Sequence, residues 1–255
     1  MKIVVLMKQV PDTWGDRKLD LATGWVDRNS SDPVIDEINE RALEAALTAA
    51  EDNKGAEVIA LTMAPGDVSE SLKKALAMGC DSAIHVCDDA LAGADSAKTA
   101  AVLAAVIRSQ GADLVVAGNE STDGRGGVVP SMIAEHLGMP HLGMLGSIEV
   151  SASTVSGVRR VDGGSQKVHA STPAVISVNE SNPDARFPSF KGIMGAKKKP
   201  VTVLSLADID VTLPAGSSTV LSTTVRPARA AGTVITDDGT AAEQLVDFLA
   251  SNRLI

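Results

Sequence analysis

Apolar runs and stretches with helical spacing alternate along the first half of the chain. The apolar runs are short and rich in β-branched residues, which is typical of strands buried on both faces of a sheet. They cover Ile3–Met7, Val58–Thr62, Ala83–Val86 and Leu114–Ala117. Because strands that alternate with helices are joined by crossover connections, the pattern predicts an α/β fold with an open, parallel, doubly wound sheet.

Capping signals predict where the intervening helices begin and end. Asp32 followed by Pro33 predicts the N-terminus of the first helix, because a capping residue precedes a proline suited to the first turn. Asp67 with Glu70 three residues later resembles a capping box, and Gly138 is placed to end the fourth helix. The expected helices cover residues 33–49, 67–79, 96–109 and 128–137.

After residue 140 the pattern changes. Short runs predict a small antiparallel β segment over residues 147–150, 154–161, 167–170 and 174–178. Residues 201–206 could add a strand to the main sheet, and residues 207–238 are small and polar, which predicts an extended arm. Thr240 with Glu243 resembles a capping box for a final helix. We therefore expect an α/β domain over residues 1–206 and an arm with its helix over residues 207–255, which either packs on a partner subunit or folds back.

Composition and charge narrow the classes of function. The net charge is −9 and only 2% of the 255 residues are aromatic, so binding to nucleic acid or to an anionic membrane is disfavoured. No apolar run approaches the roughly 20 residues of a membrane span, and the N-terminal run is too short for a signal peptide. We expect a cytoplasmic protein without membrane insertion, in which Cys80 and Cys87 are free thiols.

Two segments qualify as a binding site, since open parallel sheets bind ligands beyond the carboxyl ends of their strands. One is Lys8–Asp12, after the first strand, and the other is the loop after the fourth strand. Residues 118–127 contain four glycines and lead directly into a helix, whose free N–H groups could hold a phosphate. Arg125 and the hydroxyls of Ser121 and Thr122 could add contacts. A glycine-rich turn without a ligand is the alternative. The histidines lack metal-ligand spacing and no nucleophile motif is evident, so we expect neither a metal site nor catalytic residues.

A second candidate surface lies in residues 182–200. Phe187 and Phe190 stand there beside Ile193, Met194 and a cluster of lysines, in a chain that is otherwise acidic. Either the phenylalanines pack inward, or an exposed apolar anchor next to positive charge docks an acidic partner protein.

Taken together, these segments resemble the beta (small) subunits of electron-transfer flavoproteins over essentially the whole chain. The resemblance is carried, in order, by Val4–Asp12, Asp36–Ala42, Ala75–Asp81, Ile84–Val86, Arg159–Gly164 with Pro173–Ile176, and Pro188–Met194 with Ala196–Lys199. It implies a fold of adenine-nucleotide-binding type and a heterodimer with an alpha subunit, on which the C-terminal arm would pack. It also implies an electron carrier subunit without catalysis of its own. Through an FAD shared with the alpha subunit, the heterodimer would accept electrons from flavin dehydrogenases, such as acyl-CoA dehydrogenases, and pass them towards a quinone reductase.

The resemblance further implies a structural AMP in the beta subunit and a docking segment for dehydrogenases. By position, the AMP site would comprise Leu6, Asp36, Glu37, Ile38, Asn39, Met63, Gly118, Ser121, Thr122, Asp123, Gly124, Arg125, Gly126, Gly127, Val128 and Val129. The docking residues would be Arg186, Phe187, Pro188, Ser189, Phe190, Lys191, Gly192, Ile193, Met194 and Lys197, with Phe190 as the apolar anchor.

The glycine-rich loop departs from the pattern of AMP-binding relatives, which tend to have Gln-Ala-Ile-Asp and then a polar run. This chain has Glu120-Ser121-Thr122-Asp123 and then Gly126–Val129, so backbone N–H groups would have to hold the phosphate. Another nucleotide, a second FAD or no ligand could take the place of AMP.

Two other classes of function remain. An adenine-nucleotide-binding enzyme of the ATP-pyrophosphatase kind would carry Ser-Gly-Gly-x-Asp-Ser after the first strand, where this chain has Lys8–Asp12. A stress-type nucleotide sensor would not need the C-terminal arm.

Overall fold

The structure is a computed structural model that describes residues 1–214, 219–229 and 231–255. The described chain divides into two compact units, Met1–Ser222 and Thr223–Ile255. The predicted arm, residues 207–255, includes residues 215–218 and 230, which lie outside the described residues. The first residues of that arm belong to the first unit, where Ile209, Val211 and Leu213 pack against the core.

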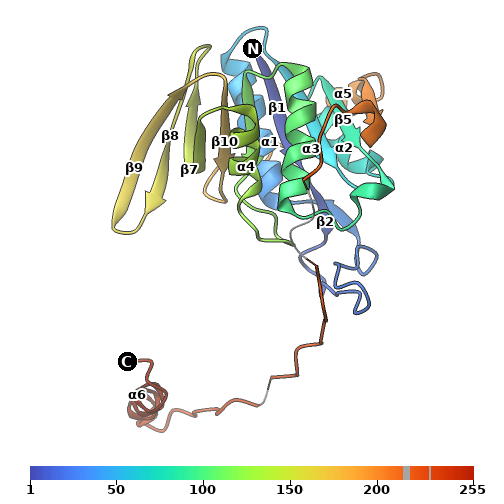
Figure 1. The fold of residues 1–255 in the computed structure, drawn as a ribbon. Coiled ribbons are helices and arrows are strands. Elements are labelled where there is room, and N and C mark those ends of the chain that lie inside the picture. The colour runs from blue at the N-terminus through green and yellow to red at the C-terminus, as the bar shows by residue number, and fades with distance from the viewer. Residues whose placement is uncertain (215–218, 230) are drawn as a thin grey trace. The chain divides into compact units, whose positions relative to one another are not determined.

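Within the described residues, one sheet of nine strands forms the centre of the first unit. The strands are β1 (Lys2–Met7), β4 (Glu57–Met63), β5 (Ser82–Val86), β6 (Leu114–Gly118), β7 (His141–Val150), β8 (Thr154–Val161), β9 (Gly164–Ser171), β10 (Ala174–Val178) and β11 (Val201–Leu204). Their order is β11-β5-β4-β1-β6-β10-β7-β8-β9 (Figure 1). Neighbouring strands pair in parallel from β11 to β7, and in antiparallel from β7 to β9. The predicted parallel α/β sheet is confirmed.

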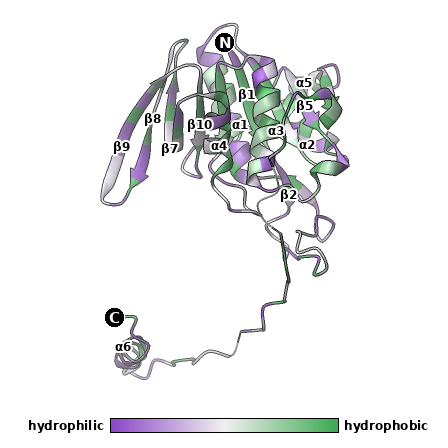
Figure 2. Cartoon of the chain, viewed as in Figure 1, coloured by the Kyte–Doolittle hydropathy of each residue, from purple (hydrophilic) through white to green (hydrophobic). Residues whose placement is uncertain are grey.

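Helices cover both faces of the parallel strands and bury two separate core clusters. The helices are α1 (Glu37–Asp52), α2 (Ser69–Met78), α3 (Ser96–Gln110) and α4 (Val129–Leu137), with a 3₁₀ turn, η1, at Asp89–Leu91 and another, η2, at Leu206–Asp208. Because side chains of a strand alternate between faces, Val5 packs with α1 and α2 whereas Val4 packs with α3 and α4. Figure 2 shows hydrophobic residues concentrated in the central strands, and a largely hydrophilic β9 at the edge.

The first helix begins later than predicted. Pro33–Ile35 forms a short strand, β3, which pairs antiparallel with β2 (Gln9–Pro11), so the residues after Asp32 are extended. The N-cap is Asp36, whose Oδ1 accepts a hydrogen bond from the Ile38 N–H at 3.1 Å. The prediction failed because the β2–β3 pairing is non-local, and proline tolerates an extended edge as well as a first helical turn.

The two predicted capping boxes are not among the contacts of the described residues. Asp67 Oδ1 accepts from the Ser69 N–H at 2.8 Å and α2 begins only at Ser69, while Glu70 pairs with Lys73. In the second unit, the Thr240 hydroxyl donates to Asp238 Oδ1 at 2.6 Å, just before α6 (Ala241–Ser251). At both helix starts an aspartate therefore forms a local turn with the residue two positions on, and this turn replaces the predicted capping box.

The C-terminal part of the sheet also differs from its prediction. Ala174–Val178 was expected in the antiparallel segment, but β10 lies between β6 and β7 and pairs in parallel with both. Strand β7 is longer than expected because its first half pairs with β10 and its second half with β8. A seven-residue helix, α5 (Phe190–Ala196), lies in a segment whose sequence shows no helical period of hydrophobic residues. The strand expected over residues 201–206 is β11, at the edge beside β5.

Both cysteines are free, as predicted. Burial raises the pKa of the Cys80 thiol to about 12. No helix among the residues that the structure describes is long and apolar enough to cross a membrane.

Candidate functional site

The candidate site lies where the strand order reverses. Strands β4 and β5 continue from β1 on one side, while β6 pairs with β1 on the other. Open α/β sheets bind ligands at the carboxyl ends of strands at such a switch point. Lys8, just after β1, and the loop of residues 118–128, after β6, both lie at this edge.

Two cations converge on the carboxylate of Asp123. Lys8 Nζ lies 2.7 Å from Asp123 Oδ1, and the Arg28 guanidinium lies 3.6 Å from Oδ2. The Gly124 N–H also donates to Oδ1, at 2.7 Å, and the side chain of Asp123 is 2% exposed. Burial raises the pKa of this carboxyl, but the charge and hydrogen bond of Lys8, together with hydrogen bonds from Ser121 and Gly124, leave the pKa below its ordinary value. Asp123 is therefore an ionised, buried anion held by the kinds of donor that bind phosphate.

Asp36 ties the first helix to the glycine-rich loop. Besides capping α1, this fully buried residue accepts hydrogen bonds at Oδ2 from the N–H and from the hydroxyl of Thr122, each at 2.6 Å. The Arg17 guanidinium donates to the carbonyl of Thr122, to its Oγ1 at 2.7 Å and to the carbonyl of Pro11. The polar groups of Asp36 and Thr122 are thus engaged within the chain and fix the shape of the loop.

Gly118 lets the end of β6 approach α1 closely. A Cβ at this position would lie 2.5 Å from Asn39 Nδ2 and 3.0 Å from a methyl carbon of Ile38. Asn39 Oδ1 accepts from the Lys8 N–H at 2.8 Å, so the same contact joins α1 to the end of β1. Gly118, Ile38 and Asn39 were predicted for the nucleotide site and lie together at the base of the loop, whereas Lys8 was not among those residues.

The part of the loop with room beside it is Gly124–Gly127. A Cβ at Gly126 would meet only Ser96 Oγ, at 3.7 Å, and one at Gly124 would make ordinary contacts with Ser121 and Lys8. The N-terminus of α3, at Ser96, therefore borders the loop, and α4 begins at its end. Among the described residues, Asn119 Oδ1 at the base of this loop is buried without a hydrogen-bond partner. The helix N-termini suit an anionic group, whereas the unpaired acceptor of Asn119 suits a hydrogen-bond donor of the same ligand.

The remaining predicted residues lie where strands end or helices begin at this edge of the sheet. Leu6 is buried near the end of β1, Met63 ends β4, Glu37 lies in the first turn of α1, and Val128 and Val129 begin α4. Arg125 has a positive φ of 49°, and its guanidinium lies 3.2 Å from Glu120.

Sequence reasoning placed Lys8–Asp12 at this edge of the sheet but missed the contacts by which three cations hold the loop. Lys8, Arg17 and Arg28 all come from the chain after β1. Residues 12–32 also carry both tryptophans: Trp14 is 95% exposed, and the Trp25 ring lies against Gly93, where a Cβ would come within 2.3 Å of it.

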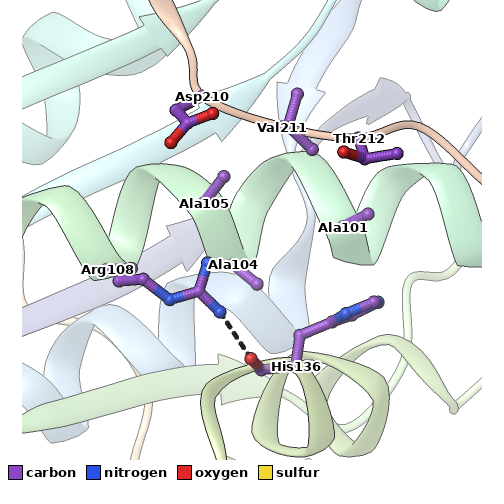
Figure 3. A pocket seen from close by; sticks show the side chains of 8 residues that line it. All are labelled: Ala101, Ala104, Ala105, Arg108, His136, Asp210, Val211 and Thr212. Carbon is purple, nitrogen blue, oxygen red and sulfur yellow. Dashed lines mark hydrogen bonds between the residues drawn. The ribbon is translucent and has the colours of Figure 1, made fainter.

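Two hollows in the first unit lie away from this loop. One, of about 260 Å³, opens between α3, α4 and residues 210–212, with three alanines of α3 along it (Figure 3). There the Arg108 guanidinium donates a hydrogen bond to the His136 carbonyl. The other, of about 210 Å³, lies on the β7–β9 extension. The described lining of both hollows excludes every predicted site residue.

The predicted docking residues lie on and around α5. Phe187 is 96% exposed and Phe190 is 82% exposed, so neither packs inward, and Ile193 and Met194 are half-exposed. Ser189 caps α5 by accepting from the Gly192 N–H at 3.0 Å, and Gly192 lies against the Ala77 carbonyl of α2. Lys191 and Lys197 are exposed beside the apolar side chains, whereas Arg186 is bonded to α1.

Nowhere in the described chain do three potential metal ligands cluster.

The chain is similar to known proteins over nearly its whole length. Residues 23–209 match the family model described as electron transfer flavoprotein domain. The electron transfer flavoprotein subunit beta of Mycobacterium tuberculosis is 47% identical over 263 residues, which cover 99% of each chain, and that of Mycobacterium leprae is 48% identical with the same coverage. The caffeyl-CoA reductase-Etf complex subunit CarD of Acetobacterium woodii is 35% identical, over 98% of this chain and 97% of that protein.

Proposed function

Since the chain belongs to the electron transfer flavoprotein family, among its beta subunits, we propose that it is the small subunit of a heterodimeric electron carrier. An alpha subunit would complete the heterodimer. Through one FAD shared with that subunit, the heterodimer accepts electrons from flavin dehydrogenases, such as acyl-CoA dehydrogenases, and passes them towards a quinone reductase. The observation that carries this proposal is the exposed phenylalanine pair beside lysines on an acidic chain.

The contribution of this chain is docking and positioning. FAD, when bound, supplies the redox chemistry, and electron transfer between two flavins requires mainly that they approach closely. Phe190 offers an apolar side chain to a partner, while Lys191 and Lys197 favour a partner surface that carries carboxylates.

We further propose that Gly124–Val129 binds an adenine nucleotide, AMP, in a structural role. The loop residues fit the phosphate because Gly126 leaves room and two helices begin beside it, while the unpaired acceptor Asn119 Oδ1 suits a donor of the same ligand, such as an amino or hydroxyl group. Lys8 is already neutralised by Asp123. Because the Arg125 guanidinium is likewise paired, with Glu120, the phosphate is held by backbone N–H groups rather than by a cation.

Co-expression with the alpha subunit tests the proposed function. We expect the two chains to co-purify as a yellow heterodimer whose absorbance spectrum is that of a flavin. A chain ending at Ser222 lacks the second unit, including the half-exposed Leu245, Val246 and Phe248 of α6, and is expected to lose most of the alpha subunit on purification. If the full chain instead formed a colourless homo-oligomer in the presence of the alpha subunit, the proposal that it is an electron carrier subunit would be refuted.

Replacing Gly126 with valine is expected to remove the nucleotide without unfolding the protein. The loop has space for a Cβ, but a branched side chain blocks close approach of a phosphate to the backbone. At a ligand concentration of about 100 Kd, the wild type should gain ~5–10 °C in Tm from the nucleotide, and Gly126→Val should gain none. The measurements are nucleotide released on denaturation and Tm with and without AMP. Gly164→Val, in β9 with open space around it, is the matched control.

A further inference from the structure

The docking segment, which we define as residues 186–199, is fastened to the first unit at both ends. At its start Arg186 reaches α1, and at its end Lys199 reaches α2. Between these two points lie α5 and the exposed apolar side chains of Phe187, Phe190 and Met194.

Arg186 makes the more extensive of the two attachments. Its Nε lies 2.9 Å from Glu44 Oε2, its Nη2 lies 2.8 Å from Glu44 Oε1, and its backbone N–H donates to Oε2 at 2.9 Å. The same guanidinium also bonds to both carboxylate oxygens of Glu51, which lies two turns further along α1. Burial raises the pKa of Glu44, but the hydrogen bonds and charge of Arg186, together with a hydrogen bond from Thr48, leave that pKa below its ordinary value. The guanidinium is thus shared between two charged carboxylates of its own chain.

The neighbouring contacts hold the backbone on either side. Arg41 of α1 lies 2.6 Å from Asp184 and also donates to the carbonyl of Asn182, which is buried. At the far end, Lys199 Nζ donates to the carbonyls of Leu76 at 2.9 Å and Cys80 at 2.6 Å, and so satisfies the C-terminus of α2.

We infer that Arg186 is a positioning residue for docking: its guanidinium, held by Glu44 and Glu51, fixes the segment that presents Phe190 and does not itself contact the partner protein. This inference rests on the proposed docking function. A segment that is ordered before the encounter loses less conformational entropy on binding than a free loop does. A short helix with two glycines has little stability of its own, so the order of α5 depends on these attachments.

The alternative is that Arg186 contacts an acidic partner directly, and removal of one carboxylate beside Arg186 separates the two roles. Under direct contact, removing a carboxylate beside Arg186 makes the surface more positive and strengthens docking or leaves it unchanged. Under positioning, removing that carboxylate releases Arg186 and weakens docking. Glu44→Gln, which keeps the shape of the side chain, therefore gives opposite results for the two roles.

The experiment uses the complete heterodimer and a purified acyl-CoA dehydrogenase reduced by its acyl-CoA. We expect Glu44→Gln and Arg186→Gln each to raise the KM for the dehydrogenase about 10-fold with kcat unchanged, and Arg186→Lys to fall between them and the wild type. Hydrogen exchange of the amides of residues 187–198 should become faster in the same variants, and the salt dependence of KM should keep its slope. Glu70→Gln, which removes an exposed carboxylate of α2 that pairs with Lys73, is the charge-matched control.

The outcomes separate this inference from the docking proposal. If Phe190→Ala raises KM but Glu44→Gln lowers it or leaves it unchanged, docking stands and the positioning role of Arg186 is overturned. If Phe190→Ala itself has no effect, the segment does not dock the dehydrogenase and both proposals are wrong. Circular dichroism and flavin content of each variant, matched to the wild type, exclude misfolding as the cause of a raised KM.

Discussion

Replacing Phe190 with alanine is expected to raise the KM of the heterodimer for an acyl-CoA dehydrogenase about 30-fold, while FAD content stays unchanged. Phe190 is 82% exposed, so its removal takes nothing from the core. A central aromatic anchor of a protein interface typically contributes about 2 kcal/mol, which corresponds to roughly 30-fold in affinity.

Steady-state electron transfer, with the heterodimer as the varied acceptor, measures this effect. Val161→Ala is a suitable control, because Val161 is an exposed apolar residue of β8, far along the sheet from α5. Equal KM values for Phe190→Ala and the wild type would show that α5 is not the docking site. A lower flavin content in the variant would instead place Phe190 in contact with the alpha subunit.

Among the variants proposed for this chain, Asp36→Ala is expected to lower the free energy of unfolding most. This fully buried carboxylate caps α1 through Oδ1 and accepts from both donors of Thr122 through Oδ2. Loss of an N-cap costs about 1 kcal/mol, and two part-buried donors of Thr122 left without an acceptor add about 2 kcal/mol. For a domain of this size, about 3 kcal/mol corresponds to a fall in Tm of ~6–12 °C.

Calorimetry of the chain stripped of nucleotide measures the loss, because the ligand-free protein separates the structural role of Asp36 from any contact with AMP. Asp36→Asn keeps one acceptor and should lose about half as much. A Tm within 1 °C of the wild type for Asp36→Ala would show that the loop and α1 are held together by other contacts.

The pattern of the sequence predicted the α/β fold because the apolar runs of β1, β4, β5 and β6 are local and buried on both faces. It misplaced the start of α1 because two aspartates, Asp32 and Asp36, both resemble caps. What separates them is the pairing of Pro33–Ile35 with Gln9–Pro11, which involves residues distant in the chain. It missed α5 because seven residues with two glycines are too short for a period to emerge.

The candidate site was located by its glycines and by the strand that precedes it, but its internal contacts could not be predicted. The contacts of Lys8 with Asp123 and of Asp36 with Thr122 join residues that lie about a hundred positions apart. Arg186 was expected to face a partner, since a charged residue in a basic segment gives no sign of a carboxylate 142 positions away. Residue types indicated the chemistry of each region, whereas the fold decides which polar groups remain for a ligand.

The placement of the tryptophans determines what optical experiments on this chain will report. Tyrosine is absent, and Trp14 and Trp25 both lie within residues 12–32, which Arg17 and Arg28 fasten to the glycine-rich loop. Intrinsic fluorescence of this subunit therefore follows the detachment of residues 12–32 from the glycine-rich loop. Far-ultraviolet circular dichroism instead follows the unfolding of the sheet and its helices. Where the two denaturation curves separate, their difference measures the free energy of that local opening rather than a folding intermediate of the whole chain.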